Sequence, residues 1–162
     1  METTSTQNCT TPVRLFRRSP DTRAFVVVHL ADQLAADRTP EAIDAAWARL
    51  TTVVDLTPHD QVLVVTGPAL ARVAMFRLPQ GRVNFRIARG PVDAVVNAEV
   101  DLDFVSRRFD YLVIASGNKL LAPFAAAAKA RDINVVQVAG ANTTSRALAQ
   151  VCTVRTALSF AA

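Results

Sequence analysis

Polar side chains follow four of the apolar segments in this sequence, where predicted strands end. They supply imidazole, carboxylate, hydroxyl and amide groups, which can donate to or accept hydrogen bonds from a polar ligand. In a parallel α/β sheet, ligands bind at the carboxyl ends of the strands, near the point where the strand order reverses. We therefore expect a binding or catalytic site at that edge. The residues are His29 and Asp32 after the first predicted strand, Thr66 and Gly67 after the second, Asp93 after the third, and Ser116, Gly117 and Asn118 after the fourth.

The elements that must position these residues alternate along the chain as strands and helices. Short apolar runs rich in β-branched residues are typical of strands covered on both faces, and they predict strands at 24–30, 61–66, 110–115 and 133–139. The run at 24–30 is the predicted central strand. The alternating arginines of 82–88 favour an edge strand. Helices are predicted at 40–54, 68–77, 91–107, 120–131 and 145–150, with 151–158 as a final strand or a packed tail.

This order predicts an α/β fold: an open, doubly wound parallel sheet of about five strands with helices on both faces, Rossmann-like in its connections. A chain of 162 residues, 51% of them hydrophobic, fits a single domain. Residues 1–22 are rich in Ser, Thr and Arg, a composition that organellar presequences share, but Glu2 and two prolines do not suit the amphipathic helix of a presequence. We therefore predict a flexible tail there and one domain over 23–162.

Composition excludes some classes of protein. Two cysteines cannot build a disulfide framework or a cysteine metal cluster, which favours a cytoplasmic location. No apolar run approaches the roughly 20 residues that span a bilayer, so no membrane partner is expected. The formal charge of +4, carried mostly by arginine, permits an acidic partner such as nucleic acid.

Two segments carry a family resemblance. GPVDAVVNAEV at 90–100, followed by FDYLVIASGNKLLAPFAAAAKARDINVVQVAG at 109–140, resembles the second half of an NYN domain, a family of the PIN-like nucleases. The matching positions, which belong to a helix-opening turn, a strand ending in S-G-D and a strand closing on V-x-G in the family, are Gly90, Asp93, Ser116, Gly117, Pro123 and Gly140.

The resemblance implies a PIN-like fold and RNA cleavage by Mg²⁺ or Mn²⁺ held between carboxylates, since such ions activate water and neutralise charge on the attacked phosphate. It makes Asp93 the principal catalytic residue and metal ligand, with Asn118 and Asp32 assisting. From its place about two turns along the helix from Asp93, Glu99 is predicted as a further metal ligand. The residues predicted for RNA binding are Ser116, Gly117 and Lys119 of the turn, and Arg86 and Arg89, which would rim the same cleft from an edge strand.

Two acidic positions of the family are altered, because Asn118 stands where relatives carry an aspartate and His29 stands at the aspartate that ends the first strand. Fewer negative charges lower the affinity for Mg²⁺. The function predicted is therefore an RNA-processing domain of a metal-dependent ribonuclease lineage whose cutting is weakened or lost. The alternatives are a non-catalytic module that binds RNA or a nucleotide, and a pseudo-nuclease subunit that pairs with a protein partner or with a second copy.

Each of these residues also has a purely structural interpretation. Asp93 would lie in the first turn of a helix, where the dipole favours a carboxylate, and Asn118 would cap the helix that follows its turn. His29 would be hydrogen-bonded within the core. Trp47 is expected in the core rather than as a platform for bases, and Arg17 and Arg18 are expected at the surface.

Overall fold

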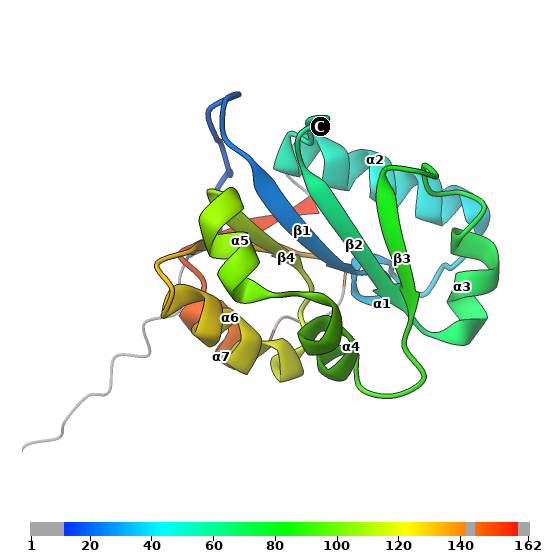
Figure 1. The fold of residues 1–162 in the computed structure, drawn as a ribbon. Coiled ribbons are helices and arrows are strands. Elements are labelled where there is room, and N and C mark those ends of the chain that lie inside the picture. The colour runs from blue at the N-terminus through cyan, green and yellow to red at the C-terminus, as the bar shows by residue number, and fades with distance from the viewer. Residues whose placement is uncertain (1–11, 142–144, 159–162) are drawn as a thin grey trace, which may run out of the picture.

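The computed structural model describes residues 12–141 and 145–158. Its centre is an open sheet of six strands, all parallel, in the order β3-β2-β1-β4-β5-β6 (Figure 1). The prediction of an α/β, doubly wound parallel sheet is confirmed, with β1 inside it and β3 at one edge. The segment 151–158 adds a sixth strand to the five expected. The strands are β1 (Ala24–His29), β2 (Gln61–Thr66), β3 (Val83–Ile87), β4 (Tyr111–Ala115), β5 (Asn134–Ala139) and β6 (Val154–Ala157).

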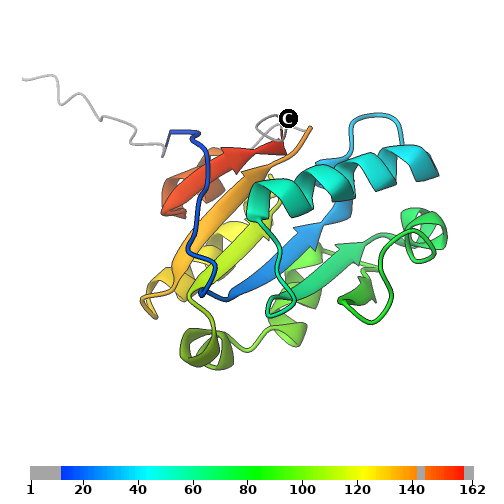
Figure 2. The same ribbon diagram turned by 90° about the horizontal axis from the view of Figure 1, so that it is seen from above.

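Helices cover both faces of the sheet (Figure 2). The first face carries α1 (Leu30–Gln33), α2 (Pro40–Val54) and α3 (Pro68–Ala74). The second carries α4 (Val92–Glu99), α5 (Leu102–Arg108), the 3₁₀ turn η1 (Lys119–Leu121), α6 (Ala122–Lys129) and α7 (Arg146–Val151). None of the helices in the described ranges is both long enough and apolar enough to cross a bilayer.

The helix predicted over 91–107 is two helices. Val100 and Asp101 adopt extended backbone angles, and the Asp101 carboxylate accepts hydrogen bonds from the backbone N–H groups of Asp103 (2.9 Å) and Phe104 (3.2 Å). An aspartate in this position caps a new helix and satisfies N–H groups that have no partner within it. The chain therefore turns between α4 and α5, where apolar periodicity alone predicted continuity.

Several residues of the predicted flexible tail make defined contacts with the domain, which corrects that expectation for the segment 13–18; residues 1–11 lie outside the described part. Val13 forms a parallel bridge to Arg155 of β6. Phe16 is 7% exposed and meets the ring of Tyr111 edge-on, with 5.4 Å between the centroids. Aromatic burial of this kind supplies the apolar area that holds the segment on the sheet.

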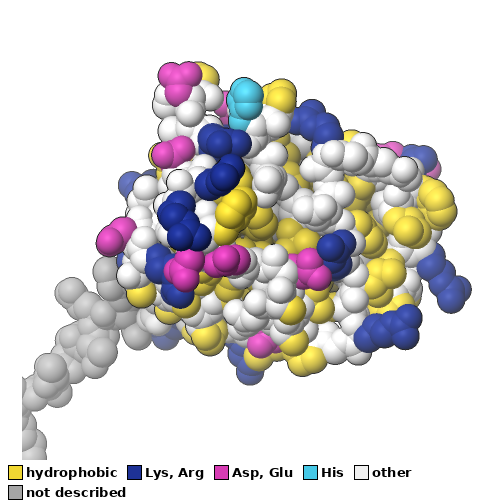
Figure 3. Space-filling model, in the orientation of Figure 1, with side chains coloured by type: hydrophobic (Ala, Val, Ile, Leu, Met, Phe, Trp, Pro, Cys, Tyr) yellow, Lys and Arg dark blue, Asp and Glu magenta, His cyan; other side chains and the backbone are white. Residues whose placement is uncertain are grey.

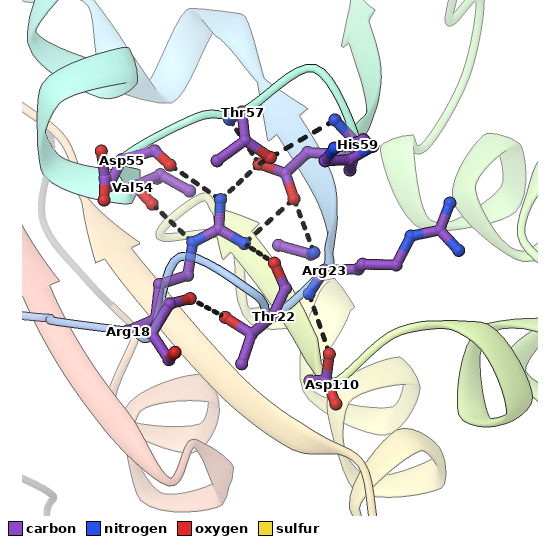
Figure 4. A network of polar contacts seen from close by, with 11 residues as sticks. Arg18, Thr22, Arg23, Val54, Asp55, Thr57, His59 and Asp110 are labelled. Carbon is purple, nitrogen blue, oxygen red and sulfur yellow. Dashed lines mark hydrogen bonds and ion pairs between the residues drawn. The ribbon is translucent and has the colours of Figure 1, made fainter.

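Arg18, expected at the surface, is buried instead in an ion pair with Asp60, and each side chain is 1% exposed (Figure 4). The Arg18 guanidinium also donates to the backbone carbonyls of Thr22, Val54 and Asp55. Asp60 accepts further hydrogen bonds from the backbone N–H groups of Ala24 (2.7 Å) and Thr57 (2.7 Å). Burial raises the pKa of Asp60, but the hydrogen bonds from Arg18 and the backbone outweigh it and hold that pKa below its ordinary value.

Gly140, directly after β5, is pressed against the backbone of α1. A Cβ atom built on Gly140 would lie 2.1 Å from the backbone oxygen of Asp32 and 2.8 Å from Cα of Gln33. Backbone atoms cannot swing aside as a side chain can. A residue without a side chain is therefore required where β5 ends beside α1.

Gly140→Ala is expected to destabilise the domain by about 3 kcal/mol or more, because the new methyl group must displace backbone. Chemical denaturation measures this free energy of unfolding. Gly67→Ala is the matched control, since nothing lies within 4 Å of a Cβ at Gly67. Equal stability of the two variants would contradict the close approach.

Candidate functional site

The polar residues after β1 and β4 meet at the carboxyl edge of the sheet, at the lower end of the strands in Figure 1. The chain leaves β1 toward β2 on one side, and it leaves β4 toward β5 on the other. The strand order therefore reverses between these two neighbouring strands. In α/β proteins generally, ligands bind outside the strand ends at such a reversal.

One carboxylate oxygen joins the two strand exits. Oδ2 of Asp32, in α1, accepts hydrogen bonds from Oγ of Ser116 (2.7 Å), the backbone N–H of Gly117 (3.0 Å) and Nδ1 of His29 (2.9 Å). Asp32 and His29 remain partly accessible, with side-chain exposures of 19% and 17%. The prediction that these residues and the Ser116–Gly117 turn lie at one edge is confirmed.

The protonation of this cluster follows from its contacts. Burial raises the pKa of Asp32, but hydrogen bonds from His29, Ser116 and Gly117 together hold that pKa below its ordinary value, so Asp32 is a carboxylate that can only accept. Nδ1 of His29 must therefore carry the proton in this contact. In the neutral imidazole, Nε2 is then an acceptor. The structural interpretation of His29 as a hydrogen-bonded residue is confirmed, although the ring is not fully buried.

Asn118 has the capping role that its position allows. Its side-chain oxygen accepts from the backbone N–H of Leu120 (3.0 Å), and its own backbone N–H donates to Oγ of Ser116 (3.0 Å). The side chain thus starts η1, as an N-cap does. Its amide NH₂ has no hydrogen-bond acceptor within the described ranges and stays available to a ligand.

Four buried side-chain polar atoms have no hydrogen-bond partner among the described residues. Two are Oε1 of Gln33 and Oγ1 of Thr156, and the other two belong to predicted positions at the end of β2 and after β3. These are Oγ1 of Thr66, which ends β2, and Oδ1 of Asp93, in the first turn of α4. The predicted place of Asp93 is confirmed. Buried polar groups are nearly always paired, so an orphaned one requires a specific explanation such as a bound water or ion.

The remaining predicted residues are arranged less tightly. Glu99 forms an ion pair with Arg86, with 2.9 Å between Oε1 and Nε, so its carboxylate is already engaged. Lys119 and Arg89 are exposed at the carboxyl ends of β4 and β3. In the described ranges, no three His, Cys, Asp or Glu side chains lie close enough together to hold a metal ion.

Gln137, which was not among the predicted site residues, is fully buried in β5. Its side-chain NH₂ donates to the backbone carbonyl of Ser116 (3.0 Å), and its oxygen accepts from Nε of Arg155 (3.2 Å). Gln137 therefore holds the turn after β4 from the neighbouring strand. A single glutamine inside the apolar run 133–139 was the signal available.

Comparison with known proteins bears on the fold alone. No family model matches the chain, and no curated protein matches it. The chain is similar to the crystal structure of a protein of unknown function from Vibrio parahaemolyticus, with a TM-score of 0.57 and 14% identity over 87% of this chain and 96% of that one. At this identity the likeness shows a shared arrangement of strands and helices.

Asp32→Asn is expected to cost roughly 1–3 kcal/mol of stability near neutral pH, since a neutral amide cannot accept three donors on one oxygen as a carboxylate does. The pKa of Asp32 is lower in the folded than in the unfolded chain, so this contribution is complete above its ordinary value of 3.8 and is lost as the pH falls through the folded pKa. The gap between wild type and variant should therefore shrink in acid. Urea denaturation near neutral pH and in acid measures this difference in the free energy of unfolding. Asp21→Asn, at an exposed site, is the control. A gap that does not vary with pH would contradict this role.

Proposed function

We propose that this domain binds RNA or a nucleotide at the carboxyl edge of its sheet, as a member of the NYN and PIN-like lineage in which cutting is weakened or lost. The observation that carries the proposal is the junction of the two strand exits at the reversal point, where Asp32 joins His29 to Ser116 and Gly117. This junction leaves Nε2 of His29 and the NH₂ group of Asn118 for a ligand. An imidazole acceptor and an amide donor suit the edge of a base or a ribose hydroxyl.

Lys and Arg side chains are spread over the face drawn in Figure 3, and those at the carboxyl edge would hold the phosphates. Lys119 follows the Ser116–Asn118 turn. Arg86 lies in the last part of β3, and Arg89 lies just after that strand. Of these, Arg86 is partly neutralised by Glu99. Lys119 and Arg89 are therefore the stronger candidates for direct contact with the RNA backbone, and the net charge of +4 favours its approach.

Binding is favoured over cutting because three of the four predicted metal ligands already use an oxygen in hydrogen bonds or an ion pair. Oδ2 of Asp32 has three donors, the oxygen of Asn118 caps η1, and Glu99 is paired with Arg86. The four residues predicted as metal ligands are Asp93, Asn118, Asp32 and Glu99. Of these, only Asp93 has a buried oxygen without a partner among the described residues. A metal-centred reaction needs several such oxygens around one ion.

Removing one basic side chain that neutralises a phosphate should weaken RNA binding and flatten its salt dependence. For Lys119→Gln and Arg89→Gln we expect lower affinity for single-stranded RNA, and each substitution should reduce the slope of log K against log salt by about 0.7. Fluorescence anisotropy with labelled RNA measures both quantities. Arg49→Gln, an exposed arginine on α2, is the control and should bind as wild type does. Wild-type protein that binds no RNA at low salt would refute the proposal and leave the interaction subunit as the alternative.

A second candidate function is metal-dependent RNA cleavage, and the orphaned Oδ1 of Asp93 specifically favours it. Mg²⁺ or Mn²⁺ would be held by Asp93 and the second oxygen of Asp32, and the ion would activate water and stabilise charge on the attacked phosphate. The residues of this chain would position the RNA, Lys119 by its charge and Asn118 through its amide.

Asn118→Asp tests whether a missing carboxylate limits this reaction. Aspartate caps helices as well as asparagine does, so the variant should fold normally, and we expect Mn²⁺-dependent RNA cleavage at least about tenfold above wild type. The double variant with Asp93→Ala should lose that gain, together with any rise in melting temperature that Mn²⁺ causes. No cleavage and no Mn²⁺ shift in Asn118→Asp would exclude the metal-dependent activity, and the RNA-binding proposal would stand or fall on its own test.

A further inference from the structure

A cavity of ≈ 200 Å³ opens at the amino ends of β2 and β3, at the opposite edge of the sheet from the candidate site. It is lined by residues of α2, of the connection from α2 to β2 and of the connection from α3 to β3. The amino ends of β2 and β3 are at the top of Figure 1. Its lining combines apolar, hydroxyl and charged side chains: Trp47, Thr51, Leu56, Thr57, Asp60, Val62, Pro79 and Arg82.

Asp60 is the only acidic residue among the described residues that line this cavity, and it is already paired. Asp60 is neutralised by its buried ion pair with Arg18, and both of its oxygens accept hydrogen bonds (Figure 4). Thr57 is held in place because its backbone N–H and its hydroxyl both contact Asp60. An anion in the cavity would therefore meet a satisfied carboxylate rather than a repelling one.

Trp47 of α2 gives the cavity an aromatic side chain. It is partly buried against the core, and it lines the cavity together with Leu56 and Val62. The core role predicted for this residue is therefore only part of its environment. An indole surface next to aliphatic side chains favours a flat ring, and cavities of about 150 Å³ hold benzene. The volume fits one aromatic ring with a small substituent.

The rim supplies a cation. Arg82 is exposed, and its guanidinium has no ion-pair partner among the described residues. Arg82 also lines a neighbouring hollow of ≈ 310 Å³. The preceding Gly81 has a φ of 83°, which side chains rarely adopt, so the turn sets the direction in which Arg82 leaves the loop. A guanidinium matches the two oxygens of a carboxylate.

We propose that this cavity binds a small aromatic carboxylate, with the ring against Trp47 and the carboxylate on Arg82. The ring replaces water against the apolar side chains. The carboxylate forms an ion pair with Arg82, which has no ion-pair partner in the described part of the chain. The site is separate from the carboxyl edge and does not depend on the RNA-binding proposal.

Trp47 reports on the cavity directly, because it is the only tryptophan in the chain. Titration with benzoate should change its emission saturably, with a Kd below about 1 mM for so small a ligand, and should raise the melting temperature of the full chain. Benzyl alcohol keeps the ring without the charge, and cyclohexanecarboxylate keeps the charge without the flat ring. Each should bind at least about fivefold more weakly than benzoate.

Arg82→Gln should weaken benzoate binding about tenfold or more and leave benzyl alcohol binding unchanged. Arg72→Gln, an exposed arginine on α3, is the matched control and should bind benzoate as wild type does. The proposal is overturned if benzoate up to about 10 mM changes neither emission nor melting temperature. It is equally overturned if Arg82→Gln binds benzoate as tightly as wild type, or if cyclohexanecarboxylate binds as well as benzoate.

Discussion

The geometry of the carboxyl edge depends on one short helix, α1, which contacts the exits of three strands. Asp32 binds the turn after β4 through Ser116 and Gly117, and it binds the end of β1 through His29. The same helix lies so close to the end of β5 that only glycine fits at 140. A four-residue helix is too short to be stable alone, so these contacts hold it and it in turn fixes the strand exits.

The two edges of the sheet use buried charge differently. At the amino edge, Arg18 and Asp60 satisfy one another and several backbone groups, so nothing in that pair is left for a ligand. A pair of this kind secures the N-terminal segment, and it is costly to break because the remaining charge would be buried alone. At the carboxyl edge, Thr66 and Asp93 each leave a polar atom without a partner in the described ranges. That difference supports the proposal of a binding site at the carboxyl edge more than the presence of charge does.

Much of the fold was predictable, because a parallel sheet buried on both faces has a strong apolar signal in every strand, and the strands at 24–30, 61–66 and 110–115 were found from it. The break between α4 and α5 was missed because Val96 and Val100 continue the apolar periodicity, while the stop depends on one capping aspartate, Asp101. The N-terminal segment was missed because its attachment depends on long-range partners of Phe16 and Arg18, which no local pattern reveals. Within the site, the convergence of His29, Asp32 and Ser116 follows from topology alone. The three-donor contact on a single oxygen does not, because it depends on rotamers set by packing.

The contacts of Asn118 separate what the fold needs at this turn from what a metal site would need. The turn needs a side-chain oxygen at this position to accept the N–H of Leu120, and asparagine provides that oxygen as well as aspartate does. The fold therefore needs no charge at this position, whereas a metal site would, since the affinity for Mg²⁺ depends on negative ligands. The contacts that form the turn are sufficient to explain Ser116-Gly117-Asn118 without a ligand. A turn of this type thus indicates how the strands are arranged, and chemistry must be inferred from atoms that the fold does not itself use, of which Oδ1 of Asp93 is the clearest at this edge.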